Sequence, residues 1–277
     1  MMEPSLKKRL LTSVIGVPLV ILALLSPNTV ITVVVILASL VGLYEYYKAV
    51  DLLKNKVLCI AGYLASIVIS TGASFSTPVN LVLVFTFIIA LFIIMLLSNK
   101  TISLSHIGLL IVGLIYIPFF LSHLSYVRAL PYGNFYIWLI FIGAFLTDTC
   151  AYFVGCNLGK HKLCPSISPK KTVEGAIGGI LGGGLSFVLF GIIVNLFFGK
   201  FLDGKHFSLL LLFVLGILSA VVSEIGDLVA SAIKRQYGIK DFGNLLPGHG
   251  GILDRCDSIL FVAPIIFLFL NLVNILV

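Results

Sequence analysis

The sequence predicts an all-α integral membrane protein, a polytopic bundle of about nine transmembrane helices with a cytoplasmic N-terminus. Three features predict it: the share of apolar residues, the length of the apolar runs, and the distribution of basic residues. Apolar side chains make up 60% of the 277 residues and charged side chains only 10%. A soluble domain averages about 25% charged residues, so this chain has too few charges to cover a surface in water.

The apolar runs predict where the helices lie. A bilayer crossing needs roughly 20 mostly apolar residues, and its backbone groups must find their hydrogen bonds within the segment. We therefore expect each run to form a helix, and the alternating ten-residue pattern of a membrane β-barrel is absent. The predicted segments are about 10–26, 29–47, 57–75, 78–98, 103–127, 134–158, 172–198, 207–233 and 252–277.

The basic residues predict the orientation. Three of them, at positions 7–9, precede the first apolar segment. If this end is cytoplasmic, most other basic residues fall on the same side, and only Arg128, Lys200 and Lys205 fall on the opposite side. This distribution is the positive-inside bias. The net charge of +7 therefore indicates orientation and affinity for anionic headgroups, and no nucleic-acid partner.

We expect the chain in the cell (inner or plasma) membrane, with two functional parts. Residues 1–130 would form N-terminal transmembrane helices. Residues 131–277 would form the C-terminal transmembrane catalytic region, with an active site facing the cytoplasm.

Acidic residues inside apolar segments are candidates for function, because a charge at the helix centre costs about 2.5–3.5 kcal/mol. Asp148 lies well within segment 134–158, so we interpret it as functional. Glu45 lies near the end of its segment among tyrosines, which is typical of the membrane interface. We interpret Glu45 as an interfacial residue.

A polar stripe runs along segment 207–233. Glu224, Asp227, Ser231 and Lys234 follow one another at spacings of three or four, so they share one helix face. An interior ion pair between Asp227 and Lys234 would explain two of them. A stripe that ends in Lys234 and Arg235 more naturally lines a wet cavity.

The segment after this stripe is rich in glycine. Residues 236–251 carry glycines around Lys240, Asp241 and His249, and glycine lets a backbone approach a ligand closely. The segment leads into a helix that starts near Ile252, and a helix N-terminus attracts phosphate. Such a loop taken alone indicates only a turn.

The next helix opens with two acids, Asp254 and Asp257, on one face. Acids at a helix start also complement the macrodipole, which contributes about 0.3–1 kcal/mol. That does not explain why they lie at the mouth of an apolar segment. Together with Asp227 they favour a site for a hard divalent cation such as Mg²⁺, which prefers oxygen ligands.

A third polar segment precedes segment 172–198. Ser168 or Thr172 would cap the helix, and Lys170 and Lys171 are either positive-inside charges or ligands of substrate phosphates. Both interpretations of the lysines stay open. Glycines repeat every four residues within the helix, which permits close helix packing and a packed homodimer interface.

The carboxylates, the basic residues and the glycine loop suit phosphoryl or nucleotidyl transfer, where catalysis is mostly positioning and charge neutralisation. An enzyme this deep in the bilayer should act on at least one lipid. No P-loop or dinucleotide-binding motif occurs in the sequence.

Residues 231–257 closely resemble the signature of the phosphatidate cytidylyltransferases (CDP-diacylglycerol synthases). Residues 148–155 and 168–175 also resemble that family, and Cys256 stands where a larger apolar residue is expected. The signature positions are Ser231, Lys234, Arg235, Lys240, Asp241, Gly243, Pro247, Gly248, His249, Gly250, Gly251, Ile252, Asp254, Arg255 and Asp257.

The resemblance implies transfer of CMP from CTP to phosphatidate, giving CDP-diacylglycerol and pyrophosphate in phospholipid biosynthesis. The implied catalytic residues are Asp227, Lys234, Arg235, Lys240, Asp241, His249, Asp254, Arg255 and Asp257. Substrate phosphates would contact Lys170, Lys171, Ser231, Gly248, Gly250 and Gly251. Mg²⁺ or Mn²⁺ would be held by Asp148, Asp227, Asp254 and Asp257. A second, monovalent cation is a further expectation.

Two alternatives come from other classes. A transporter of an anionic solute would use Asp148, Glu224 and Asp227 as coupling sites, but no internal repeat relates the halves of the chain. Another lipid-linked phosphotransferase or a lipid kinase is the closer alternative. The CDP-alcohol phosphotransferase motif is absent, because Ser258 follows Asp257 where that motif has glycine.

Overall fold

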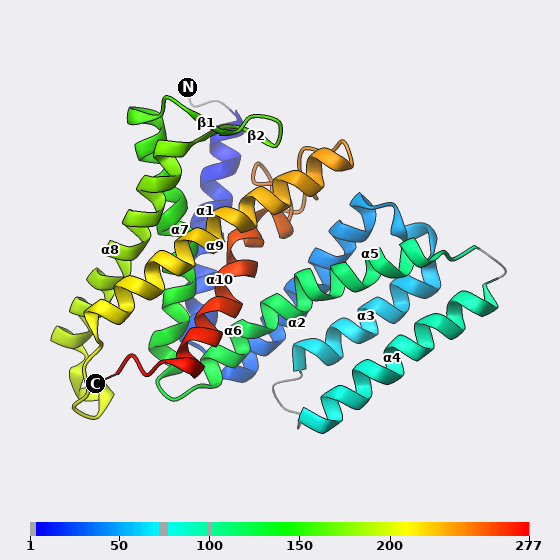
Figure 1. The fold of residues 1–277 in the computed structure, drawn as a ribbon, viewed down its shortest axis with the longest axis horizontal. Helices are drawn as coiled ribbons and strands as arrows, with labels where there is room; N and C mark the ends of the chain where they lie inside the picture. Colours follow the sequence, from blue (N-terminus) through cyan, green and yellow to red (C-terminus); the bar gives the residue numbers. More distant parts are fainter. Residues whose placement is uncertain (1–3, 72–76, 99–100, 277) are drawn as a thin grey trace. The chain divides into compact units, whose positions relative to one another are not determined.

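The computed structural model describes residues 4–71, 77–98 and 101–276, and most of them are helical (Figure 1). Each predicted apolar segment overlaps helical structure, and residues 72–75 and 277 of two of these segments lie outside the described residues. The helices are α1 (Pro4–Leu25), α2 (Asn28–Ala49), α3 (Lys56–Thr71), α4 (Thr77–Leu97), α5 (Leu104–Leu114), α6 (Phe120–Ala129), α7 (Gly133–Leu158), α8 (Val173–Phe197), α9 (Leu209–Gln236) and α10 (Leu253–Leu272). Shorter elements are η1 (Leu52–Lys54), the π-helical turn η3 (Ile115–Phe119) and η4 (Gly199–Leu202).

The length and composition of these helices confirm an all-α membrane protein. In the part of the chain that is described, five helical stretches are long and apolar enough to cross a membrane. They are Asn28–Ala49, Leu104–Ala129, Gly133–Leu158, Val173–Phe197 and Leu209–Gln236. The count of nine crossings and the cytoplasmic N-terminus stay predictions. The side chains at positions 7–9, on which the orientation rests, lie outside the described ones.

A two-stranded hairpin that was not predicted precedes α8. Strand β1 (Lys162–Cys164) pairs antiparallel with β2 (Ser168–Thr172) (Figure 1). Ser168 lies in β2, so it does not cap the helix. Thr172 does, because its hydroxyl accepts a hydrogen bond from the Gly175 backbone N–H at 3.1 Å. The hairpin thereby places Lys171 one residue before the cap.

The chain divides into two compact units. The first comprises Met1–Tyr126 and Tyr237–Arg255, and the second comprises Val127–Gln236 and Cys256–Val277. Within the first unit, Tyr46 and Tyr47 of α2 are buried against helices that carry glycine at the contact. The Tyr47 hydroxyl lies against Gly62 and the Tyr46 ring against Gly113. The predicted separation of roles at residue 130 stays a prediction.

Small residues hold the second unit together. Helix α8 packs against α7 and α9 through its glycines, as the four-residue repeat predicts. A Cβ at Gly179 would lie 2.9 Å from the Ala151 Cβ, and one at Gly183 would lie 2.8 Å from the Ala220 Cβ. The glycines of α8 therefore serve packing within one chain.

Candidate active site

The second unit gathers charged side chains from a hairpin and two helices. The Lys171 ammonium at the end of β2 lies 2.5 Å from Glu224 Oε2 and 2.8 Å from Asp227 Oδ2 on α9. The side chains of Lys171 and Glu224 are 19% and 8% exposed. The sequence suggested an ion pair between Asp227 and Lys234, whereas in the structure Asp227 pairs with the hairpin lysine, Lys171.

Burial and charge act in opposite directions on Lys171. Burial lowers the pKa of its ammonium, but the Asp227 and Glu224 carboxylates outweigh burial and leave the pKa above its usual value. Lys171 is therefore a permanent cation at neutral pH. Lys171 is partly buried and ion-paired, so it is not simply a solvated positive-inside charge. Lys170 is exposed, so that interpretation stays open for it.

Asp148 and Asp257 belong to the same cluster. The Ser258 hydroxyl on α10 donates to Asp148 Oδ2 at 3.3 Å. Asp148 also lies within electrostatic range of Asp227, Lys171, Asp257 and Glu224. We call Asp148, Lys171, Glu224, Asp227 and Asp257 the acidic cluster. It contains four carboxylates and one ammonium, so its charge favours a further cation.

The acidic cluster supplies oxygen donors that suit Mg²⁺. Among residues 4–71, 77–98 and 101–276, however, no three His, Cys, Asp or Glu side chains lie close enough together to hold a metal ion as they stand. The cluster has the oxygen donors that a hard cation prefers. Its side chains are positioned, however, to form ion pairs and hydrogen bonds within the protein.

The other predicted residues of the second unit lie at the end of α9. Ser231 and Lys234 are partly buried there, and Arg235 is exposed. The Arg235 Nε donates to the Ile167 carbonyl oxygen at the turn of the hairpin, at 3.4 Å. This hydrogen bond connects the end of α9 to the hairpin.

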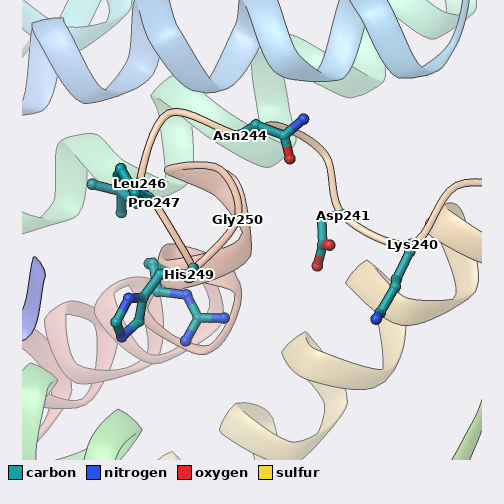
Figure 2. A pocket seen from close by; sticks show the side chains of 9 residues that line it. Lys240, Asp241, Asn244, Leu246, Pro247, His249 and Gly250 are labelled. Carbon is teal, nitrogen blue, oxygen red and sulfur yellow. The ribbon is translucent and has the colours of Figure 1, made fainter. Parts of the chain in front are cut away.

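The first unit contains a polar pocket of about 630 Å³ in the segment after α9 (Figure 2). Figure 2 shows Lys240 and Asp241 on the arm of the loop that enters the pocket and His249 on the arm that leaves it. The pocket is lined by Lys240, Asp241, Asn244, Leu246, Pro247, Gly248, His249, Gly250 and Arg255. Both glycines of this lining, Gly248 and Gly250, have positive φ values, of 79° and 87°, which glycine adopts without strain.

His249 receives a contact from the beginning of the chain. The Thr12 hydroxyl on α1 lies 2.6 Å from His249 Nδ1 and donates to the Pro247 carbonyl oxygen at 3.4 Å. No pattern in the sequence connects residues separated by more than 200 positions, so Thr12 was not predicted.

Asp254 has a different environment from Asp227. It is 4% exposed, and its Oδ2 accepts hydrogen bonds from the Phe242 and Gly251 backbone N–H groups at 2.8 and 3.0 Å. Glu45 of α2 lies beside it and accepts from the Ile252 and Leu253 backbone N–H groups at 3.1 and 2.9 Å. Glu45 is therefore no exposed interfacial acid. The neighbouring tyrosines favoured an interfacial position, so the hydrogen bonds of Glu45 to the loop backbone were not predicted.

The chain is similar to known proteins over nearly all of its length. The model of the cytidylyltransferase family matches residues 7–273. A phosphatidate cytidylyltransferase of Staphylococcus haemolyticus is 34% identical over 264 residues, which cover 94% of this chain and 97% of the relative. One of Bacillus subtilis is 40% identical over 66% of this chain and 68% of its own length. One of Rickettsia bellii is 42% identical over 60% of this chain and 71% of its own length. With the match extending over nearly all of its length, the chain belongs to the cytidylyltransferase family.

Proposed function

We propose that the chain transfers CMP from CTP to phosphatidate and releases CDP-diacylglycerol and pyrophosphate. The observation that carries this proposal is the family match over residues 7–273, together with full-length similarity to a relative named phosphatidate cytidylyltransferase. Apolar helices long enough to cross a membrane agree with a lipid substrate. The reaction makes the chain a nucleotidyltransferase of phospholipid biosynthesis.

The pocket of the first unit suits a nucleotide. Its volume of about 630 Å³ lies within the range of about 300–1,000 Å³ typical of small-molecule sites. Lys240 and Arg255 supply positive charge for phosphate oxygens, and the glycines at 248 and 250 let backbone approach the ligand. We assign the triphosphate of CTP to this pocket, with His249 as a hydrogen-bonding residue.

The acidic cluster of the second unit suits a divalent cation. We propose Asp148, Asp227 and Asp257 as ligands of Mg²⁺ or Mn²⁺, because carboxylate oxygens are the donors these ions prefer. When bound, the ion supplies charge neutralisation at phosphate oxygens. Asp254 was predicted as a fourth ligand, but its Oδ2 already accepts two backbone hydrogen bonds. We assign Asp254 to the loop instead, and a second, monovalent cation stays a prediction.

The chemistry needs no strong general base. The second pKa of a phosphate monoester is about 6, so the attacking oxygen of phosphatidate is already largely anionic at pH 7. This oxygen forms a bond to the α-phosphorus of CTP, and the bond from that phosphorus to the bridging oxygen of pyrophosphate breaks. The barrier comes from bringing two anions together. Cationic side chains lower such a barrier by neutralising phosphate charge. The proposed ones are Lys240 and Arg255 in the first unit and Lys171, Lys234 and Arg235 in the second.

We also propose that the reaction occurs at the cytoplasmic face of the cell membrane, with the N-terminus on that side. The support is the positive-inside bias of the sequence. Phosphatidate would enter laterally from the inner leaflet. A homodimer is a further prediction, and the glycine face of α8 gives it no support, because α7 and α9 of the same chain occupy that face.

An assay with two alternative pairs of substrates tests the activity. The purified chain in detergent should form CDP-diacylglycerol from CTP, phosphatidate and Mg²⁺, and should form no phosphorylated lipid from ATP and diacylglycerol. Lipid phosphorylation by ATP would favour the kinase alternative. Failure to release pyrophosphate when both CTP and phosphatidate are present would overturn the proposal.

A further inference from the structure

We propose that Glu45 of α2 is a positioning residue of the nucleotide site, whose buried carboxylate holds residues 242–253 in the shape that binds CTP. This inference deepens the proposed function and rests on it. Glu45 lies outside the signature segment, 207 positions before Ile252. It acts through backbone N–H groups and is not among the residues that line the pocket of Figure 2.

The carboxylate of Glu45 caps the start of α10. Its Oε1 accepts from the Ile252 N–H at 3.1 Å, and its Oε2 accepts from the Leu253 N–H at 2.9 Å. The first N–H groups of a helix have no partner within the helix, and a negative charge is stabilised near them. Glu45 is only 4% exposed, so the folded chain shields most of this carboxylate from solvent.

Two glycines enclose this carboxylate. A Cβ at Gly243 would lie 2.6 Å from Glu45 Cδ, and a Cβ at Gly251 would lie 2.5 Å from the same atom. Neither glycine has a positive φ value. Glycine is required at both positions because a larger residue would overlap the carboxylate. Both arms of the loop therefore lie against the Glu45 carboxylate.

Asp254 completes the arrangement from the helix itself. Its Oδ2 accepts from the Phe242 and Gly251 N–H groups at 2.8 and 3.0 Å. Two buried carboxylates thus bind four backbone N–H groups, at both ends of the segment that carries His249 into the pocket. The side chains that line the pocket do not make these bonds. We call Glu45 and Asp254 the anchors: they fix the backbone and leave the lining side chains available to a ligand.

The expected consequence of losing an anchor is weaker binding of CTP. A loop that must be ordered on binding lowers affinity, whereas a loop ordered beforehand does not. Glu45→Gln keeps the size of the side chain but leaves one carbonyl oxygen for two N–H donors, and its amide N–H₂ faces one of them. We expect the KM for CTP to rise about tenfold, because hydrogen bonds to a charged carboxylate are stronger than those to a neutral amide.

The test compares three variants of the full chain in detergent micelles that contain phosphatidate. Glu45→Gln should raise the KM for CTP while the KM for phosphatidate and kcat stay within about twofold of wild type. Glu45→Asp, which keeps the charge on a shorter side chain, should give an intermediate KM for CTP. Asp51→Asn is the matched control, because Asp51 is an exposed acid just after α2 that pairs with Lys54. It should match wild type within about twofold, as surface substitutions usually do.

Hydrogen exchange of the same proteins separates positioning from general instability. In Glu45→Gln without CTP, peptides covering residues 242–254 should exchange faster, peptides from α3 and α5 should not change, and saturating CTP should restore protection. A KM for CTP equal to that of Asp51→Asn, or faster exchange throughout the chain with both KM values raised together, would overturn the positioning role. Wild-type protein that forms no CDP-diacylglycerol would overturn the proposed function itself.

Discussion

The Lys171 ammonium at the end of β2 lies 2.8 Å from the Asp227 Oδ2 of α9. The same ammonium lies against Glu224, one turn earlier on that helix. A single cation thus stabilises two carboxylates in a part of the protein where an unpaired charge is costly. The ion pairs connect the hairpin to the acidic cluster, and the first prediction follows from them.

Replacing Lys171 should abolish most activity. Lys171→Met leaves Glu224 and Asp227 without this ammonium, and we expect kcat to fall at least about 100-fold, a size typical of losing a charge-stabilising group. Lys171→Arg keeps the charge but changes its geometry, so it should retain more activity. Lys162→Met on the exposed position of β1 is the control. Equal rates for Lys171→Met and Lys162→Met would contradict the assignment.

Replacing Asp257 should abolish CMP transfer without preventing membrane insertion. We expect Asp257→Ala to lose at least about 100-fold in kcat and Asp257→Asn to need more Mg²⁺ for half-maximal rate. Chelation of divalent ions should stop the wild-type reaction, and added Mg²⁺ or Mn²⁺ should restore it. Asp203→Asn is a suitable control, because Asp203 accepts from the Tyr132 hydroxyl elsewhere in the second unit. Near-normal activity of Asp257→Ala at saturating Mg²⁺ would rule out the metal assignment.

Removing the Thr12 hydroxyl should lower kcat/KM for CTP, because this hydroxyl contacts His249. Thr12→Val loses the contacts to His249 Nδ1 and the Pro247 carbonyl oxygen. We expect kcat/KM for CTP to fall about fivefold, since one hydrogen bond contributes about 1 kcal/mol, and Thr12→Ser to restore it. Thr71→Val removes a hydroxyl that bonds only carbonyls of its own helix and should have no such effect. A normal Thr12→Val enzyme would show that His249 needs no orientation by α1.

Labelling from the two sides of the membrane should locate the pocket. We expect Leu245→Cys, at a position 58% exposed, to react with an impermeant maleimide in inside-out vesicles and not in intact cells. Lys205→Cys, between α8 and α9, should react in intact cells. Both substitutions belong in a chain whose five native cysteines are replaced by serine. Labelling of Leu245→Cys only from outside would reverse the predicted orientation.

The helices were predictable because their signal is local. An apolar run of sufficient length satisfies its backbone bonds only as a helix, and the segment 134–158 accordingly matches α7 at Gly133–Leu158. The hairpin of β1 and β2 carries no such signal. Its strands are three and five residues long, too short for a pattern of alternation to stand out.

The site was predictable in its residue types and less so in its contacts. The sequence placed Asp227 and Lys234 on one helix face, but Asp227 pairs with Lys171, which comes from an unpredicted hairpin. Glu45 and Ile252 are separated by 207 positions, and helical periodicity relates only near neighbours. Such pairings are set by how helices pack, which a single sequence does not reveal.

The fate of the α-phosphorus of CTP tests the central claim most directly. Wild-type protein is incubated with CTP labelled at that phosphorus, phosphatidate and Mg²⁺, and the label is followed into lipid and water-soluble fractions. The account predicts that the label enters CDP-diacylglycerol only when phosphatidate is present, with one pyrophosphate released for each lipid formed. Label that stays entirely in soluble nucleotides while all three components are present would contradict it.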